Sequence, residues 1–279
     1  MRKQQWALIL TGILLLVGLY FFGNTVAPKQ PLPPSEDAAA SATLTTEQVI
    51  AKYKAGLNTQ QMQTLTQLEN SVVRGDVHNQ QIHVYHQLAS YWADTLHHEE
   101  IGAYYSGEAA KLENSEKSLT FAAHLLLDNM LSATDASMQR WLATQAKELF
   151  DKALTINPNN DSSKIGVGVC YMFGGISDNP MQGILAIKEI ADKDSNNMYA
   201  QMMLGLGGIQ SGQYDKAAER FLKVVQKQPG NIEAILDLAG VYERIGNKAE
   251  AIKWYKDALT LVQVPDAKKD IEERIKSLQ

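Results

Sequence analysis

The chain has 279 residues, of which 45% are hydrophobic and 20% are charged, with 19 glycines and 8 prolines. This composition is typical of a globular protein and excludes a fibrous or wholly disordered chain. The formal net charge is −5 at pH 7, and the 26 basic residues, which include Arg2 and Lys3, are outnumbered by 31 acidic ones. Neither nucleic acid nor an anionic membrane surface is therefore indicated as a partner.

The N-terminal residues carry a membrane-insertion signal. Arg2 and Lys3 lie in a short basic head, 1–5, ahead of an uncharged apolar run over 6–22. At about 1.5 Å per residue, a helix of this run is about 25 Å long, near the short end of what crosses a bilayer. The basic residues precede the run and keep the N-terminus on the cytoplasmic side. We therefore predict a transmembrane signal anchor over residues 6–23.

A cleaved secretory signal is the alternative interpretation of the same run. The candidate cleavage site at 25–27 is followed directly by Pro28, which signal peptidase tolerates poorly, so a retained anchor is favoured. No cysteine lies at the end of the run to accept a lipid. The predicted location is a bacterial inner membrane, with a single pass through the lipid bilayer and the rest of the chain facing the periplasm.

Two segments connect the anchor to the rest of the chain. Residues 24–44 are rich in Pro, Ala and Ser and contain few large apolar side chains, which predicts a disordered linker. Residues 45–77 are expected to form a helical lead-in. Thr45 and Thr46 are candidate N-caps, and a break at 56–58 separates two predicted helices.

From residue 78 onward the pattern is helical throughout. Apolar patches of 12 to 18 residues alternate with short turns that carry Gly, Asn, Asp or Pro, and strand-like alternation does not occur, so we predict an all-α fold. Two consecutive stretches, 198–231 and the one that starts at 232, have small and aromatic residues at the same mutual spacings. These residues are Leu204, Gly205, Gly212, Tyr214, Ala217, Phe221, Val224 and Pro229, then Ile235, Leu238, Ala239, Tyr242, Gly246, Ala251, Tyr255 and Ala258.

This spacing resembles the tetratricopeptide-repeat (TPR) family. In such repeats small residues let two helices approach closely, while leucine and aromatic residues fill the seam between them. The resemblance implies a right-handed α-solenoid of about five helix pairs over 78–265, closed by a charged capping helix at 266–279. The earlier units fit less well, because about three residues are inserted near 177–180 and a longer turn is expected at 134–137.

The resemblance also implies a concave ligand groove along the first helix of each pair. Met and aromatic side chains that packing does not use would suit an apolar peptide or helix as the ligand. The predicted groove residues are Ile165, Val169, Met172, Phe173, Tyr199, Met202, Leu206, Ile209, Leu236, Glu243 and Arg244, with Glu233 beside them. A basic clamp for a C-terminal carboxylate is missing from these positions. Two alternatives stay open, since the helices at 46–73 or a second copy of the chain could cover the same residues.

No catalytic, cofactor or metal site is predicted. The glycine-rich segments 166–171 and 205–208 lie in helical stretches and lack the Lys-Ser/Thr of a phosphate-binding loop. A zinc site needs three or four converging ligands, and a cluster of five histidines divides between two stretches of a hairpin. These are His78, His83, His86, His97 and His98. Cys170 lies in an apolar stretch and is expected to be buried and inert. No Ser-His-Asp order is recognisable.

Together these features predict a non-enzymatic scaffold or adaptor, tethered to the membrane, that binds a protein or peptide client. TPR proteins with this layout resemble accessory factors of protein export, envelope assembly and cytochrome maturation. The alternative is a structural homo-oligomer whose arrays pair with each other.

Overall fold

The computed structural model describes residues 44–74 and 78–279. All of these residues belong to one unit, Thr43–Gln279. The predicted basic head, the signal anchor and all but the last residue of the linker lie outside the described residues, so they stay predictions. Within the described ranges no helix has the length and apolar character needed to cross a membrane.

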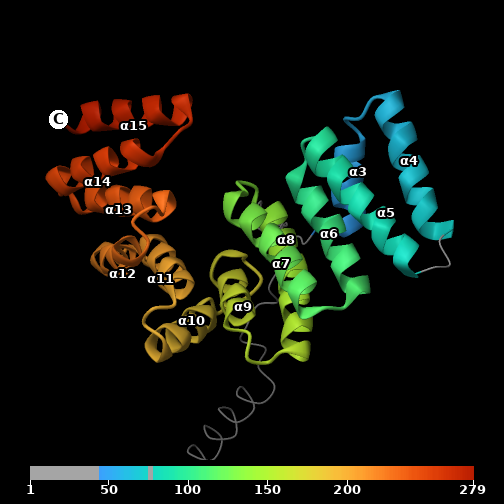
Figure 1. Cartoon of the computed structure of the whole chain (residues 1–279), viewed down its shortest axis with the longest axis horizontal. Coiled ribbons are helices and arrows are strands. Elements are labelled where there is room, and N and C mark those ends of the chain that lie inside the picture. Colours follow the sequence, from blue (N-terminus) through green and yellow to red (C-terminus); the bar gives the residue numbers. More distant parts are fainter. Residues whose placement is uncertain (1–43, 75–77) are drawn as a thin grey trace, which may run out of the picture. The chain divides into compact units, whose positions relative to one another are not determined.

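The described residues are helical and contain no strand, which confirms the all-α prediction. Figure 1 shows how the α-helices follow one another. This part of the chain contains thirteen α-helices and one π-helical turn. They are α3 (Thr46–Lys54), α4 (Thr59–Arg74), α5 (His78–Ser90), η1 (Tyr91–Thr95), α6 (Glu99–Glu113), α7 (Glu116–Ser132), α8 (Ala136–Ile156), α9 (Asp161–Phe173), α10 (Met181–Lys193), α11 (Met198–Gln210), α12 (Tyr214–Lys227), α13 (Ile232–Ile245), α14 (Lys248–Leu261) and α15 (Pro265–Leu278).

The helices from α5 to α14 form five pairs, in which the first helices are α5, α7, α9, α11 and α13. The first helix of each of the last three pairs begins after an asparagine that caps it. Asn160, Asn197 and Asn231 each accept a hydrogen bond from the backbone N–H three residues later, at 2.9, 3.0 and 3.0 Å. A cap of this kind stabilises a helix by about 1 kcal/mol. The first helices of these three pairs therefore begin at equivalent positions of the repeat.

Small residues set the distance between the two helices of a pair. A β-carbon added at Gly205 would lie 2.6 Å from the ring of Phe221, and one added at Gly208 would lie 3.0 Å from Ala217. Because the later residue of α11 meets the earlier residue of α12, the two helices run antiparallel. The side chains of Ala217, Phe221 and Ala251 are 0% exposed. The predicted seam of the last two pairs is thus confirmed.

The connections within pairs differ in length. Between α9 and α10 the chain has seven residues, 174–180, whereas three residues, 211–213, join α11 to α12. An insertion near 177–180 was expected, and the structure places it in this loop. The longer turn expected at 134–137 is wrong, because α7 ends at Ser132 and α8 already begins at Ala136. Asp135 caps α8 by accepting from the backbone N–H of Met138 at 2.7 Å, which starts this helix early.

The helices that flank the five pairs pack against particular neighbours. The indole N–H of Trp141 in α8 donates to the Thr46 hydroxyl at 3.2 Å, and the rings of Tyr53 and His98 lie 4.6 Å apart. The lead-in helix α3 therefore contacts the second helix α8 and the N-cap of the second helix α6. At the other end, α15 packs on α14 (Figure 1). Its apolar residues Ile271 and Ile275 are buried there.

Candidate functional site

The predicted groove residues lie on α9, α11 and α13, the first helices of three successive pairs. Four of them are buried within the chain, since Ile165 and Val169 are 0% exposed, Met172 is 4% and Met202 is 5% exposed. The other apolar members are half-buried. They are Phe173, Tyr199, Leu206, Ile209 and Leu236. The structure thus differs from the expectation that all these side chains are free to contact a ligand.

The burial of the α9 residues has a physical cause. The first helices on both sides, α7 and α11, contact α9. The His124 ring of α7 lies 5.5 Å from the Tyr199 ring of α11. The terminal methyl of Met172 fills the space beside Gly207, where an added β-carbon would lie 2.5 Å from it. The middle of the predicted groove is therefore covered by the neighbouring first helices.

A polar cluster that the sequence analysis did not single out lies at the start of α9. The Nε2 atom of His124 is 2.8 Å from the Ser162 hydroxyl, and the hydroxyls of Thr120 and Ser163 are 3.1 Å apart. Burial lowers the pKa of His124 and raises the pKa of Asp128, one helical turn further on. No hydrogen bond joins Asp128 to His124 in the part of the chain that is described. The acid therefore does not orient the imidazole in this structure.

The charged end of the predicted groove is engaged within the chain. The Glu243 carboxylate accepts from Arg274 Nε of α15 at 2.9 Å and from the Tyr255 hydroxyl at 3.2 Å. The guanidinium of Arg244 lies 5.7 Å from the centroid of the Tyr214 ring. Glu243 thus holds the last helix in place, and Arg244 is the exposed charged residue of the predicted set.

One carboxylate on α13 is unpaired. Oδ2 of Asp237 is shielded from solvent and has no hydrogen-bond partner among the described residues. Burial raises the pKa of Asp237 to about 6, with a smaller contribution in the same direction from Glu233 and an opposing one from Arg244. Asp237 belongs to the least buried face of α13, which we call the α13 stripe: Glu233, Leu236, Asp237, Gly240 and Arg244. Sequence spacing places these residues on one helix face, but burial of an unpaired acid is visible only in the structure.

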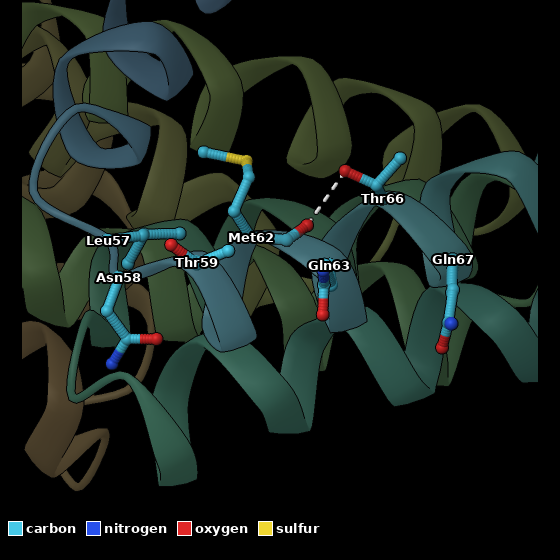
Figure 2. A pocket seen from close by; sticks show the side chains of 7 residues that line it. All are labelled: Leu57, Asn58, Thr59, Met62, Gln63, Thr66 and Gln67. Atoms are coloured by element: carbon cyan, nitrogen blue, oxygen red, sulfur yellow. Dashed lines mark hydrogen bonds between the residues drawn. The ribbon is translucent and has the colours of Figure 1, made fainter.

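The surface also has a hollow that does not suit a site. Its volume is about 670 Å³. Figure 2 shows the lining side chains along α4 and the preceding turn. The Thr66 hydroxyl donates to the Met62 carbonyl at 2.8 Å, one turn back in the same helix. The hollow is lined by uncharged side chains of one turn and one helix, namely Leu57, Asn58, Thr59, Met62, Gln63, Thr66 and Gln67. It offers no titratable group and no second element to enclose a ligand.

The histidine cluster is likewise divided among separate contacts. His86 pairs with Glu113 at 2.8 Å, and His78 contacts the Leu112 carbonyl at 2.8 Å. No group of three or more His, Cys, Asp or Glu side chains that could hold a metal ion occurs in the described ranges. Cys170 is buried, and burial raises the pKa of its thiol to about 12, which keeps it protonated and unreactive.

Comparisons with known proteins give one family and several structures. Residues 196–279 match the family described as "Regulator of microtubule dynamics protein 1-3", which corresponds to α11–α15. No curated protein matches the chain. The matched segment is less than a third of the chain, so it describes these five helices alone.

Solved structures with similar arrangements are TPR-containing or MamA proteins. YrrB, described as a TPR protein with an unusual peptide-binding site, is 16% identical with a TM-score of 0.41, covering 68% of this chain and 91% of YrrB. MamA is 20% identical with a TM-score of 0.42, covering 66% and 98%. MamA from Desulfovibrio magneticus RS-1, residues 41 to the end, is 18% identical with a TM-score of 0.41, covering 64% and 94%. Because these identities and TM-scores are low, the TPR-like description of this chain depends on its own helix pairs and seam residues.

Proposed function

We propose that the chain is a membrane-tethered scaffold that binds a protein or peptide client on the first helices of its last two pairs. The observation that carries the proposal is the difference between α9 and α13. The α9 side chains Ile165 and Val169 are 0% exposed. On α13, by contrast, Leu236 is half-buried and Arg244 is exposed. Leu206 and Ile209 of α11 are half-buried, and we assign them to the same binding surface. An accessible apolar surface with a few polar groups suits an apolar peptide or helix.

A photo-crosslinking amino acid at the exposed position Arg244 tests this site in cells. Leu206→Ala combined with Leu236→Ala should weaken client capture by about 2–4 kcal/mol, the usual loss for two apolar anchors. The matched control is Met181→Ala with Leu185→Ala, because these α10 residues are 53% and 60% exposed but lie on a second helix. Loss of crosslinks in both double mutants, or in neither, would contradict a site on α11 and α13. Melting temperatures of all variants show whether folding is intact.

The tether and the location are part of the same proposal. They are supported by the apolar run over 6–22 and the basic residues before it. A periplasm-dependent reporter fused after Gln279 should be active, and the protein should remain with the membrane after a high-salt wash. A soluble product whose N-terminus lies near Pro28 would show instead that the signal is cleaved. An envelope role in assembly or export follows only if the anchor is retained.

A structural homo-oligomer is the second candidate. Met181 and Leu185 are exposed one helical turn apart on α10, and such a pair is an apolar contact available to another copy. Sedimentation of the wild type and of Leu185→Lys separates the two candidates. A dimer that dissociates with this substitution favours the oligomer, and a monomer in both cases excludes pairing through α10.

A further inference from the structure

The position of Asp237 in its repeat is unusual. The caps Asn197 and Asn231 start equivalent helices, and the sixth residue after each is Met203 in α11 and Asp237 in α13. Met203 is 6% exposed and packs in the core. Asp237 thus places a carboxylate where the preceding pair has a buried apolar side chain. Packing of the repeat does not call for an acid at this position.

The surroundings of Asp237 leave its charge uncompensated. No described residue donates a hydrogen bond to it or forms an ion pair with it, and its Oδ2 atom is out of contact with solvent. Among the described residues, the cation that lowers the pKa of Asp237 is Arg244, but it lies seven residues further along the helix, which is about 10 Å. Its guanidinium is placed over the Tyr214 ring. A carboxylate that is partly desolvated and unpaired is unfavourable for the free protein and favours a cationic partner.

We propose that Asp237 binds a lysine or arginine side chain of the client, whose flanking apolar residues lie on Leu206, Ile209 and Leu236. The proposal rests on the proposed function and names the chemistry of its partner. The occupant is a short peptide segment with one basic residue among apolar ones, because a single unpaired acid within an apolar surface is complementary to that pattern. The acidic balance of the chain, 31 acidic against 26 basic residues, agrees with a cationic ligand.

Selection from a phage-displayed library of random 12-residue peptides, with the full chain as bait, tests the proposal. Enriched peptides that compete with one another and carry one Lys or Arg between apolar residues are expected. Enrichment of apolar peptides without a basic residue would overturn the role of Asp237 but leave the binding surface intact. If no peptide is enriched, or if binding is unchanged by Leu206→Ala with Leu236→Ala, the proposed function fails as well.

The strongest selected peptide is then measured by fluorescence anisotropy against three forms of the full chain. Asp237→Asn should raise its Kd about tenfold or more, because it removes one partner of a desolvated pair. Asp257→Asn is the matched control, since it removes the same charge by the same substitution at an exposed position on the second helix α14, and it should change Kd about twofold or less.

If the basic residue of the peptide contacts Asp237, then removing either group should remove the same interaction. Replacing the basic residue of the peptide by Gln should weaken binding to the wild type as much as Asp237→Asn does. The Gln peptide should then lose little more on the Asp237→Asn protein, because the interaction is already absent. Equal losses for Asp237→Asn and Asp257→Asn, or additive losses in the double replacement, would overturn the assignment.

Discussion

Asp237→Asn is expected to stabilise the protein in a way that depends on pH. The ordinary pKa of an aspartate is 3.8, and burial raises that of Asp237 to about 6. The folded state therefore binds more protons than the unfolded state between these values, and stability falls as pH rises through this window. The neutral Asn has about the same shape and carries no charge to desolvate. The stability of Asp237→Asn should therefore not fall as pH rises through this window.

The size of the effect follows from the two pKa values. Their difference of about 2 corresponds to about 3 kcal/mol at 1.36 kcal/mol per pKa unit. Because the Asp237 side chain is partly exposed, about 2 kcal/mol is the more realistic gain for Asp237→Asn at pH 8. At pH 4.5 the folded wild type carries a mostly protonated Asp237, whereas the unfolded chain is already mostly ionised there, so the two proteins should differ by about 1 kcal/mol, half the difference at pH 8.

Urea unfolding followed by circular dichroism at 222 nm measures the difference at both pH values. Comparing variants at each pH removes the contributions of all other titrating groups. Asp257→Asn is the control and should shift neither midpoint, because Asp257 is exposed on α14. A wild type that is more stable than Asp237→Asn at pH 8 would refute the reasoning, since it would mean that the carboxylate has a favourable partner in the folded chain.

The remaining predictions concern the seams. Ala251 is 0% exposed between α13 and α14, so Ala251→Glu should lower the unfolding free energy by about 3 kcal/mol or more, whereas Ala249→Glu at an exposed position should change it by about 0.5 kcal/mol or less. A melting temperature of Ala251→Glu within a degree or two of the wild type would show that the repeat register is wrong. Gly205→Ala should destabilise by about 1–3 kcal/mol, because its methyl would meet the Phe221 ring at 2.6 Å, and Phe221→Leu should recover part of this loss in the double mutant.

The helix pairs could be predicted from the sequence because local signals encode them. Glycine and alanine recur where two helices cross, and Gly205 and Ala217 lie at such crossings in the structure. Asparagine caps such as Asn197 and Asn231 add a start signal that is also local. Spacing along the chain therefore suffices to find each pair, and the errors are confined to connections such as the one before Asp135.

Contacts between pairs could not be predicted in the same way. Spacing shows which side of α9 Met172 lies on, but its burial depends on how closely α11 approaches, which the sequence pattern does not state. His124 and Ser162 are 38 residues apart and meet only because α7 contacts α9. Glu243 was expected to face a ligand, yet Arg274 reaches it from the capping helix. Each of these contacts depends on the angle between successive helix pairs, whereas the residue spacing describes only the packing within a single pair.

The accessible surface lies on α13 because of the position of this helix near the end of the array. The helix α9 has a first helix on each side, and both α7 and α11 contact it. Beyond the pair α13–α14, the described chain continues only with α15. This helix packs on α14 and contacts α13 through Arg274, which binds Glu243. In the part of the chain that is described, no further first helix covers the α13 stripe as α11 covers α9. The Asp237 side chain is half-buried there, so it is only partly desolvated until a cationic partner arrives. The end of the array is thus the place where an acid costs the fold least and can contribute most to recognition.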